Sequence, residues 1–586
     1  MNSKILLIFP PSIRPNRPYL SIPLLVGQLK NKGFDAAGLD LNLEFYSDIL
    51  SKEYILKTKL LMENIAKITD HNDMPDGFLQ KQEIIKKYLE HPEYIDKLIT
   101  QVDVAVKTLK SKKDFYNPQL LRNAHEIINQ VVIFLSLPYY PSKCTSDPIT
   151  YNFKLNYKEI KDYCFDKNQN IFIEYFEKKI DEIIANDLDL IGISVPFDSF
   201  IPIALTLSRL LKEKTNAHIT IGGQAISYNS DAILKYPEFF DIFCDSVLTG
   251  AGESSIVELA NYIENKTDIE NVSGLIYKTG QDDIKKNPVK QITSMDNIAN
   301  ISLDGLNLDK YYTPDILMPI IFSKGCPWGK CIFCSFPHDR QVYCIKKVDK
   351  IIDEIEELNK KHKLKFFRFH DDCIPPAFYE KLADEIIKRK LDIKYSSFGR
   401  LDKGFTKKLL KKLYKSGLRF IFWGLESGSE RILKQMNKGI DIKYASQVLK
   451  NSHDAGIYNH ASLIIGFPSE SEEDFRHTYD FCEANRKYID SYGAGKFGLQ
   501  AHSAIYTMQE QFGITENINE EFSFCKEYKS TNISEEEINR RLKLIYDNFP
   551  IVEIDFLYIL KYGNNLYKLI NKFHSIRSKY CIKKPK

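Results

Sequence analysis

The sequence predicts an α/β protein in which a doubly wound parallel sheet is followed by a partial barrel of six strand–helix repeats. Two observations support this fold class. Short apolar runs typical of buried strands alternate with amphipathic helical stretches over residues 4–285 and again over 318–510. Glycines or polar residues directly follow most of these predicted strands, as they do where parallel sheets bind ligands. With 586 residues the chain is also too long for one core and should divide into several domains.

The composition is that of a soluble globular protein, with 43% hydrophobic and 27% charged residues. The 81 basic and 78 acidic residues nearly balance, so we expect no nucleic-acid partner. No apolar run reaches the roughly 18 residues needed to span a bilayer, so we expect no integral membrane association. The 11 cysteines are an odd number and mostly scattered, which argues against a disulfide framework and favours a cytoplasmic location.

The first unit opens with a strand–helix–strand pattern. Residues 4–9 and 34–41 have the character of strands, and residues 22–32 between them have that of a helix ending at Gly33. From about 45 to 180, helical periodicity in a stretch rich in Lys, Ile, Leu and Glu predicts a helical insertion of unknown role. We interpret this insertion as extra packing rather than as a substrate lid.

Two glycine turns mark the ends of later strands in this unit. The strand pattern resumes at residues 188–195, 218–221 and 246–249. The last two of these strands run into turns that contain Gly222, Gly223, Gly250, Gly252 and Glu253. Small residues there would let the backbone approach a flat or phosphorylated ligand closely. Neither turn has the dinucleotide pattern G-x-G-x-x-G, so the turns alone do not identify a ligand.

The second unit covers residues 318–510 and follows a linker over residues 286–317. Its strands are predicted near 318–323, 364–370, 393–398, 419–424, 458–465 and 492–499. Chemistry in parallel barrels lies at the carboxyl ends of strands. The residues at those ends are a cysteine loop after the first strand, Asp371 and Asp372 after the second, Arg400 after the third and Glu426 after the fourth. Residues 511–586 read as a helical C-terminal region with a basic tail.

The cysteine loop carries the strongest chemical signal. Cys326, Cys331 and Cys334 have the spacing C-x4-C-x2-C within nine residues. Three thiolates so close together are ligands for zinc or for an iron–sulfur cluster. His338 could complete a Cys3His zinc site, and Cys344 or Cys373 could complete a four-cysteine cluster, although we interpret both as free cysteines. A cluster held by three cysteines leaves one iron open to a small molecule.

Together with two further motifs, this loop resembles radical S-adenosylmethionine (SAM) enzymes. The motifs are Trp423-Gly424-Leu425-Glu426-Ser427, with Lys438-Gly439 behind it, and Ile464-Ile465-Gly466-Phe467-Pro468 before Glu472-Glu473-Asp474. The first unit resembles the cobalamin-binding domain that precedes the barrel in one large class of these enzymes. The resemblance therefore implies a Rossmann-like (flavodoxin-like) cobalamin-binding domain with a helical insertion, then a partial (β/α)6 radical SAM barrel.

The resemblance implies three cofactors. Cys326, Cys331 and Cys334 would hold a 4Fe–4S cluster whose open iron binds SAM, and one electron would cleave SAM to a 5′-deoxyadenosyl radical. Cobalamin would deliver a methyl group. No D-x-H-x-x-G motif occurs in the chain, so we expect base-off cobalamin without a histidine ligand. The family's usual spacing is C-x3-C-x2-C, and the extra residue here would have to be absorbed by a bulge at Pro327 and Gly329.

The resemblance also assigns residues around SAM. Phe333 matches an aromatic residue near the adenine, with ordinary loop packing as the alternative. Asp371 and Asp372 follow the strand that contacts the SAM amino group. Arg400 matches an arginine that pairs with the methionine carboxylate, and Glu426 could accept hydrogen bonds from the ribose. The alternative is that these charges pair with one another. The sequence identifies no catalytic residue beyond these cofactor contacts.

Three functions remain open at this stage. The first is a cobalamin-dependent radical SAM methyltransferase acting on an unactivated carbon or a phosphinate-type centre. The second is a related enzyme that uses cobalamin for cyclisation, ring contraction or another rearrangement. The third is a non-catalytic zinc- or cluster-binding protein. For either enzyme we expect a small-molecule or peptide substrate and an electron donor such as flavodoxin or ferredoxin, and fold does not choose the substrate.

Overall fold

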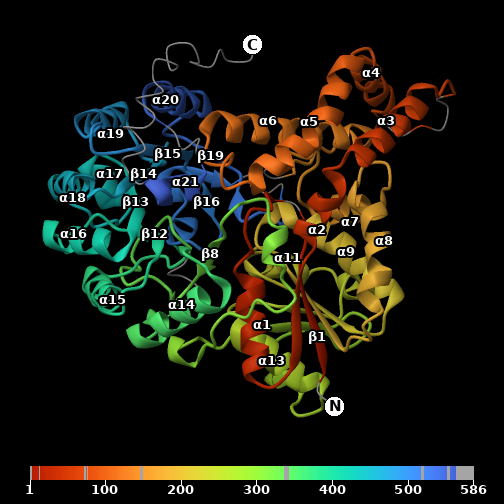
Figure 1. Cartoon of the computed structure of the whole chain (residues 1–586). Helices are drawn as coiled ribbons and strands as arrows, with labels where there is room; N and C mark the ends of the chain where they lie inside the picture. Colours follow the sequence, from red (N-terminus) through yellow and green to blue (C-terminus); the bar gives the residue numbers. More distant parts are fainter. Residues whose placement is uncertain are drawn as a thin grey trace. The chain divides into compact units, whose positions relative to one another are not determined.

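The computed structural model describes residues 3–11, 13–70, 74, 77–145, 149–335, 342–516, 520–550 and 555–562. The chain forms two compact units (Figure 1). The N-terminal unit comprises Met1–Gln291, Ile298–Ile316 and Ile518–Phe524. The C-terminal unit comprises Ile292–Asn297, Leu317–Asn517 and Cys525–Lys586. Among the described helices, none is long and apolar enough to cross a membrane.

The N-terminal unit is built on a seven-stranded sheet with the order β2-β1-β3-β4-β5-β6-β7. Its strands are β1 (Lys4–Phe9), β2 (Asp35–Asp40), β3 (Leu190–Ser194), β4 (His218–Gly222), β5 (Ser246–Leu248), β6 (Leu275–Lys278) and β7 (Ile284–Lys286). The first five are parallel and have the flavodoxin-like order 2-1-3-4-5. An antiparallel pair, β6 and β7, extends the sheet beyond β5.

The strand connections explain why these strands are so apolar. Helices α1 (Ser21–Asn31), α9 (Ile201–Lys214) and α13 (Gly252–Ile263) link β1 to β2, β3 to β4 and β5 to β6. All five residues of β3 are buried, because a central parallel strand is covered on both faces. The central strands therefore read as continuous apolar runs rather than as alternating ones.

The stretch predicted as a helical insertion does consist of helices. These are α2 (Leu41–Ile49), α3 (Lys52–Ala66), α4 (Phe78–Leu89), α5 (Pro92–Lys110), α6 (Pro118–Ser136), α7 (Tyr157–Phe165) and α8 (Phe172–Ile184). Helices α5 and α6 pack side by side (Figure 1). Helix α5 buries Ile95, Leu98, Val102 and Ala105, which lie on one face of the helix.

The C-terminal unit contains a six-stranded parallel sheet whose strands pair in chain order, β8-β11-β12-β13-β14-β15. The strands are β8 (Leu317–Ile320), β11 (Phe366–Phe369), β12 (Lys394–Gly399), β13 (Leu418–Glu426), β14 (Tyr458–Ile465) and β15 (Ser491–Lys496). The connecting helices are α14 (Val348–His362), α15 (Pro376–Lys388), α16 (Lys407–Ser416), α17 (Glu430–Gln435), α18 (Ile442–Ala455) and α19 (Glu472–Ala484). This is the arrangement of successive strand–helix repeats.

The prediction of a purely helical region after residue 510 is wrong. Short antiparallel pairs come first: β16 (Leu499–Gln500) with β18 (Cys525–Lys526), and β17 (Ile514–Glu516) with β19 (Tyr528–Ser530). Phe512, Ile514 and Tyr528 pack in a core cluster with Phe497. This burial stabilises strands that are too short to show alternation of apolar and polar residues in the sequence. Helices α20 (Glu535–Asn548) and α21 (Phe556–Tyr562) follow, and the basic tail lies outside the described residues.

The predicted linker is largely irregular; its residues Ile298–Ile316 belong to the N-terminal unit and Ile292–Asn297 to the C-terminal unit. Tyr311, from residues 298–316, is fully buried, and its hydroxyl donates to Oδ2 of Asp40 at 2.6 Å. Asp40 ends β2 and caps α2 by accepting from the backbone N–H of Leu43 at 2.9 Å. Burial raises the pKa of Asp40 to about 6, and the Tyr311 hydrogen bond opposes that rise.

Tyr311→Phe should lower the free energy of unfolding by about 1–3 kcal/mol at pH 7, because it leaves a buried carboxylate with one partner fewer. Since the folded pKa of Asp40 is already raised, its ionised form costs stability as the pH rises through about 6. The loss should therefore be larger at pH 7 than at pH 4.5. Urea unfolding followed by circular dichroism measures this loss of unfolding free energy, and Tyr444→Phe, at an exposed tyrosine, is the control. Equal losses at both pH values would contradict the role of the Tyr311 hydrogen bond to ionised Asp40.

Candidate functional site

The three cysteines lie in a loop that follows β8 and is enclosed by a small strand pair. Strand β9 (Ser323–Lys324) precedes the loop and pairs antiparallel with β10 (Cys344–Ile345). All three thiols are partly exposed. The loop backbone is tied to other segments at Ile332, whose N–H donates to the carbonyl of Met436 at 3.0 Å and whose carbonyl accepts from Ile505 at 2.9 Å. The loop is thus held from outside rather than by regular secondary structure.

The donor set is three cysteine thiols on one short loop, which is the ligand chemistry of a 4Fe–4S cluster and also of zinc. In the described part of the chain, no three Cys, His, Asp or Glu side chains gather closely enough to hold one metal ion. His338, the candidate fourth zinc ligand, lies outside the described residues.

The environment of Cys326 favours the thiolate form that binds iron. A hydrogen bond with the Cys373 thiol lowers the pKa of Cys326, burial raises it, and the backbone N–H groups of Gly329 and Trp328 lower it, for a net value of about 6. Lys438 adds a positive charge near both Cys326 and Cys331. Burial raises the pKa of Cys331, and Lys438 opposes that rise, so the thiolate form, which is the metal ligand, is favoured at Cys326 alone of these two.

The two aspartates after β11 have different environments. Asp371 is fully buried, and its Oδ1 accepts from the Ser323 hydroxyl at 2.6 Å and the Phe322 N–H at 3.0 Å. Burial raises the pKa of Asp371 to about 7. Asp372 is exposed. The fold therefore uses Asp371 to fix the start of the cysteine loop, and only Asp372 is accessible to a ligand.

Glu426 is paired with Lys438. Its Oε1 lies 2.8 Å from the ammonium nitrogen of Lys438, and the two side chains are only 12% and 11% exposed. A β-bulge between β13 and β14 and a φ of +65° at Glu426 turn this carboxylate toward the pair. Gly424 leaves room for it, because an added Cβ would lie 2.7 Å from Glu426 Oε1. The charge pairing considered from sequence occurs here, with a lysine as partner.

Phe333 packs within the core and also borders this pair. It contacts the cluster that contains Ile432, Met436 and Phe467. The ammonium nitrogen of Lys438 lies 5.9 Å from the centre of its ring. Loop packing, the alternative role for Phe333, is therefore present in the structure.

Arg400 directs its donors at the protein backbone. Its Nη2 donates to the carbonyls of Lys438 at 2.9 Å and Gly439 at 2.6 Å, and its Nε donates to Lys438 at 3.2 Å. Its guanidinium carbon lies 4.0 Å from the centre of the Trp328 ring. Arg400 thus connects the cysteine loop to the segment Met436–Gly439, a contact that the sequence did not predict.

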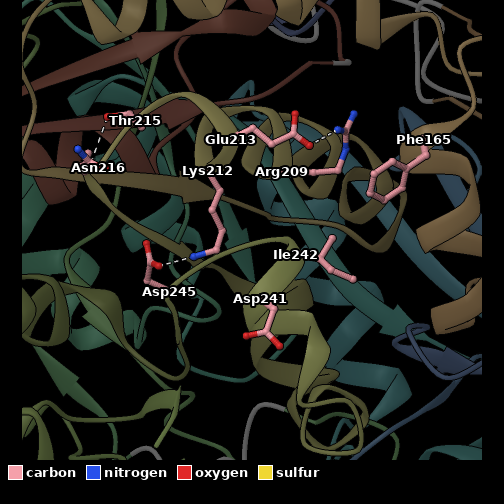
Figure 2. Close-up of a pocket in the computed structure, with 10 residues that line it drawn as sticks. Phe165, Arg209, Lys212, Glu213, Thr215, Asn216, Asp241, Ile242 and Asp245 are labelled. Carbon is pink, nitrogen blue, oxygen red and sulfur yellow. Dashed lines mark hydrogen bonds and ion pairs between the residues drawn. The ribbon is translucent and has the colours of Figure 1, made fainter. Parts of the chain in front are cut away.

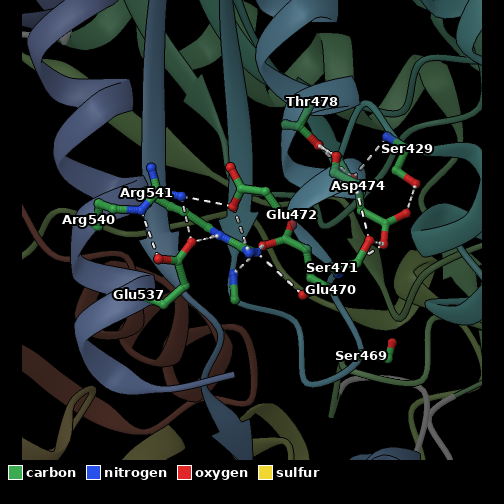
Figure 3. Close-up of polar contacts among 12 residues, drawn as sticks. Ser429, Ser469, Glu470, Ser471, Glu472, Asp474, Thr478, Glu537, Arg540 and Arg541 are labelled. Atoms are coloured by element: carbon green, nitrogen blue, oxygen red, sulfur yellow. Dashed lines mark hydrogen bonds and ion pairs between the residues drawn. The ribbon is translucent and has the colours of Figure 1, made fainter. Parts of the chain in front are cut away.

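A buried ion pair holds the loop after β14 (Figure 3). Glu470 Oε2 accepts from the Gly466 N–H at 2.9 Å and lies 3.0 Å from Arg541 of α20, and neither side chain is more than 4% exposed. Arg541 also pairs with Glu537 at 2.7 Å and Glu472 at 3.1 Å. Helix α20 therefore fixes the Gly466-Phe467-Pro468 turn that the sequence singled out.

A second polar group in Figure 3 joins this loop to the end of β13. Asp474 forms a capping box with Ser471 at the start of α19 and accepts from the Ser429 hydroxyl at 2.6 Å. Burial would raise the pKa of Asp474, but hydrogen bonds from Arg431, Ser429 and Ser471 outweigh it and hold the pKa well below its usual value. The Ser427 and Thr478 hydroxyls, 3.0 Å apart, add a further link.

In the N-terminal unit, the glycine turns have structural reasons that the sequence did not reveal. Gly223 has a φ of +122°, and an added Cβ would lie 2.5 Å from the Val195 carbonyl oxygen. Gly250 has a φ of +77°, and its Cβ would lie 2.6 Å from Val289. Chain packing by itself is therefore enough to require glycine at both positions. At Gly222 and Gly252 the nearest atoms to an added Cβ are 3.3 and 3.4 Å away, and Glu253 is buried at the start of α13.

Sequence reasoning missed an aromatic group at the carboxyl ends of β1 and β3. The rings of Phe9 and Tyr19 stack at 4.7 Å between centroids, and Tyr19 and Phe197 meet edge to face at 6.3 Å. Phe197 is half exposed. The switch point between β1 and β3 is where sheets of this order bind ligands. The signal in the sequence was an aromatic residue at the end of one buried strand, Phe9, and another three residues after the adjacent strand, Phe197.

Residues 520–524 fix the neighbouring loops of the N-terminal unit. The Phe524 N–H donates to Asp198 Oδ2 at 2.6 Å, and its ring lies 4.3 Å from that of Tyr228. Glu521 accepts from the Tyr236 hydroxyl at 2.9 Å. Asp198 follows β3 and Tyr228 follows β4, so this segment braces the carboxyl edge of the sheet.

A hollow of about 560 Å³ lies near the amino ends of β4 and β5, on the opposite edge of the sheet (Figure 2). Four of its charged side chains pair with one another: Arg209 lies 2.6 Å from Glu213, and Lys212 lies 2.5 Å from Asp245. A fifth, Asp241, lies 2.6 Å from Lys278. Parallel sheets bind ligands at their carboxyl ends, so this hollow is not the candidate site.

Comparison with known proteins identifies the C-terminal unit. Residues 320–482 match the model of the Radical SAM superfamily, so the chain carries a radical SAM domain. The chain is 27% identical over 305 residues to an uncharacterized methyltransferase of Pyrococcus horikoshii, a match that covers 51% of this chain and 64% of that protein. It is 28% identical over 249 residues to the anaerobic magnesium-protoporphyrin IX monomethyl ester cyclase of Rubrivivax gelatinosus, covering 40% and 44%. The chain thus spans less than two thirds of each relative.

A solved structure resembles nearly the whole chain. It is the radical S-adenosylmethionine methyltransferase TsrM from Kitasatospora setae, with tryptophan substrate and a SAM analog bound. The TM-score is 0.59 at 14% identity, covering 98% of this chain and 100% of that one. At this identity the likeness concerns the fold.

Arg541→Met should destabilise the C-terminal unit by about 3–5 kcal/mol, because it leaves the buried Glu470 carboxylate without its cation. Arg540→Met is the matched control: its side chain is 47% exposed, so the loss should stay below about 1 kcal/mol. Burial already raises the pKa of Glu470, and removing Arg541 raises it further, so the deficit should shrink as the pH falls and Glu470 becomes neutral. Urea unfolding followed by tryptophan fluorescence tests this, and equal effects of both variants would contradict it.

Proposed function

We propose that this chain, which carries a radical SAM domain, is a cobalamin-dependent radical SAM methyltransferase. The observation that carries the proposal is the position of the three-cysteine loop. It follows the first strand of a six-stranded parallel sheet, inside the region matched by the family model. A flavodoxin-like sheet precedes it, and its carboxyl edge offers exposed aromatic surface. The methyltransferase relative supports the same assignment.

The residues present fit a 4Fe–4S cluster on Cys326, Cys331 and Cys334. When bound, the cluster and SAM supply a 5′-deoxyadenosyl radical after one-electron reduction, and cobalamin supplies a methyl group. The protein's share is to hold the thiolates, orient SAM and restrict water. The external hydrogen bonds of the cysteine loop serve the first of these tasks.

We assign the SAM contacts as follows. The exposed Asp372 is the carboxylate for the SAM amino group, since Asp371 is buried in the fold. Glu426, oriented by Lys438, faces the ribose hydroxyls. Phe333 presents its partly buried ring to the adenine while it packs on the core.

For cobalamin, the carboxyl edge of the N-terminal sheet supplies the site. A corrin is a large flat ring, and the half-exposed Phe197 beside Tyr19 offers an aromatic face at the β1/β3 switch point. Gly222, Gly223, Gly250 and Gly252 shape the neighbouring turns, and Glu253 is buried beside the last of them. We expect the cofactor in its base-off form without a histidine on cobalt, because the chain has no D-x-H-x-x-G motif.

The methyl acceptor is an unactivated carbon or a phosphinate-type centre of a small molecule or peptide. TsrM was solved with tryptophan, which shows that this fold accommodates a small aromatic substrate in that protein. A reduced flavodoxin or ferredoxin in the cytoplasm is the electron donor that suits the cluster chemistry. The alternative function of this chain is cobalamin-assisted cyclisation or rearrangement, which the similarity to the cyclase supports.

Anaerobically reconstituted protein should bind about four irons per chain and cleave SAM under strong reductant. The variant with Cys326, Cys331 and Cys334 all changed to Ala should lose both properties. With candidate substrates, a methyltransferase forms S-adenosylhomocysteine together with 5′-deoxyadenosine, whereas a cyclase forms only the second. Liquid chromatography with mass spectrometry measures the ratio. Stoichiometric zinc with no iron uptake would overturn the radical SAM assignment.

Hydroxocobalamin should remain bound after desalting and show a base-off absorption spectrum. Phe197→Ala should weaken its binding about tenfold, because an aromatic contact contributes on the order of 1.5 kcal/mol. Phe165→Ala removes an equally exposed ring from the opposite edge of the same sheet and is the matched control. Spectroscopic titration gives the two affinities. Wild type without retained corrin would point to a radical SAM enzyme that works without cobalamin.

A further inference from the structure

We infer that Trp328 is the positioning residue that accommodates the C-x4-C spacing of the cysteine loop. This rests on the proposed function, because it concerns how the cluster ligands are held. The loop has one residue more between Cys326 and Cys331 than the family's usual C-x3-C. Between these two cysteines, the indole of Trp328 contacts Asn437 of the segment Met436–Gly439, which follows α17.

The indole is held by two different contacts. Its Nε1–H donates to the carbonyl of Asn437 at 2.9 Å. Its ring lies 4.0 Å from the guanidinium carbon of Arg400, a distance at which a cation stacks on an aromatic face. Arg400 is itself fixed by three hydrogen bonds to the carbonyls of Lys438 and Gly439. The indole therefore stacks on a guanidinium group whose orientation is fixed by backbone carbonyls.

Two glycines make this arrangement possible. Gly439 has a φ of +65°, and a Cβ there would lie 2.3 Å from Cζ2 of Trp328, so only glycine leaves room for the indole. Gly329 follows the tryptophan with a φ of +59°, which reverses the chain toward Cys331. An added Cβ at Gly329 would lie 3.3 Å from the Cys326 carbonyl oxygen, so the bulge is compact.

The same short segment also positions the other side of the site. Met436 accepts from the Ile332 N–H, between the second and third cysteines. Lys438 pairs with Glu426, which we assign to the ribose of SAM. The segment Met436–Gly439 thus fixes the cysteine loop near two of its thiols and orients a SAM contact as well. Among the contacts between this segment and the loop, that of Trp328 lies nearest to Cys326 along the chain.

This geometry gives Arg400 a role different from the one expected by resemblance. The methionine carboxylate of SAM would need the donors of the guanidinium group. In Arg400, Nε and Nη2 already donate to backbone carbonyls, and the Trp328 ring covers one face of the guanidinium plane. Arg400 acts on the cluster through Trp328 and is a positioning residue.

The test compares Trp328→Ala, Trp328→Phe and Lys330→Ala. Lys330 is an exposed residue of the same loop whose ammonium nitrogen lies 5.3 Å from the centre of the Trp328 ring. Lys330→Ala is the control that removes this cation and keeps the contacts of the indole with Asn437 and Arg400. In reconstituted protein, Trp328→Ala should lose cluster iron to a chelator several-fold faster than wild type. Trp328→Phe keeps the stacked ring but not the N–H donor, so it should be intermediate. Lys330→Ala should match wild type. Urea unfolding followed by the fluorescence of Trp423, which lies in the same unit and is unchanged in all three variants, shows that this unit is folded.

A second measurement uses the metal-free protein and does not depend on the cluster. Alkylation of Cys326 by iodoacetamide, mapped by mass spectrometry, should be several-fold faster in Trp328→Ala than in wild type. Gly439→Val, which displaces the indole without removing it, should give the same increase. Equal alkylation rates in wild type and these variants would overturn the inference. A wild type that alkylates as expected but binds no iron would instead overturn the proposed function.

Discussion

The site depends on the backbone carbonyls of the four-residue segment Met436–Gly439. The cysteine loop lacks regular secondary structure, so its shape must come from contacts with something more rigid. Met436 and Asn437 accept hydrogen bonds from the loop, and Lys438 and Gly439 accept those of Arg400, which supports Trp328. This segment follows helix α17, and the buried network around Asp474 holds the chain just before that helix. The packed helices therefore hold the segment Met436–Gly439 in place, and this segment in turn holds the cysteine loop.

In the C-terminal unit, two largely buried carboxylates each lie beside a largely buried cation that offsets the cost of burying their charge. Glu426 with Lys438 and Glu470 with Arg541 are both ion pairs with little exposure, and each would be costly if either partner were removed. Both pairs fix loops at the carboxyl edge of the sheet, where a cofactor has to be aligned. Such pairs contribute orientation more than net stability, which fits their position beside a reactive site.

The sequence predicted the regular elements well, because a buried parallel strand or an amphipathic helix leaves a local pattern. The strand at 458–465 and the helices between 45 and 180 are examples. It failed for β17 and β19, where Ile514 and Tyr528 are held by distant core residues and not by local alternation. It could not reveal the partners of Arg400, because backbone carbonyls 38 and 39 residues away leave no signal in side-chain type. Gly223 was singled out for ligand space, and the sequence could not reveal that its positive φ and the Val195 backbone already require glycine there.

The central claim is that Cys326, Cys331 and Cys334 hold a cluster with one iron open to SAM. Mössbauer spectroscopy of protein reconstituted with ⁵⁷Fe, recorded with and without SAM, tests it most directly. If the claim is right, about a quarter of the iron signal should shift when SAM is added, since one of four irons changes its ligands. A spectrum of four equivalent, unresponsive irons would indicate a closed cluster with a fourth protein ligand, such as Cys373, and would contradict the claim.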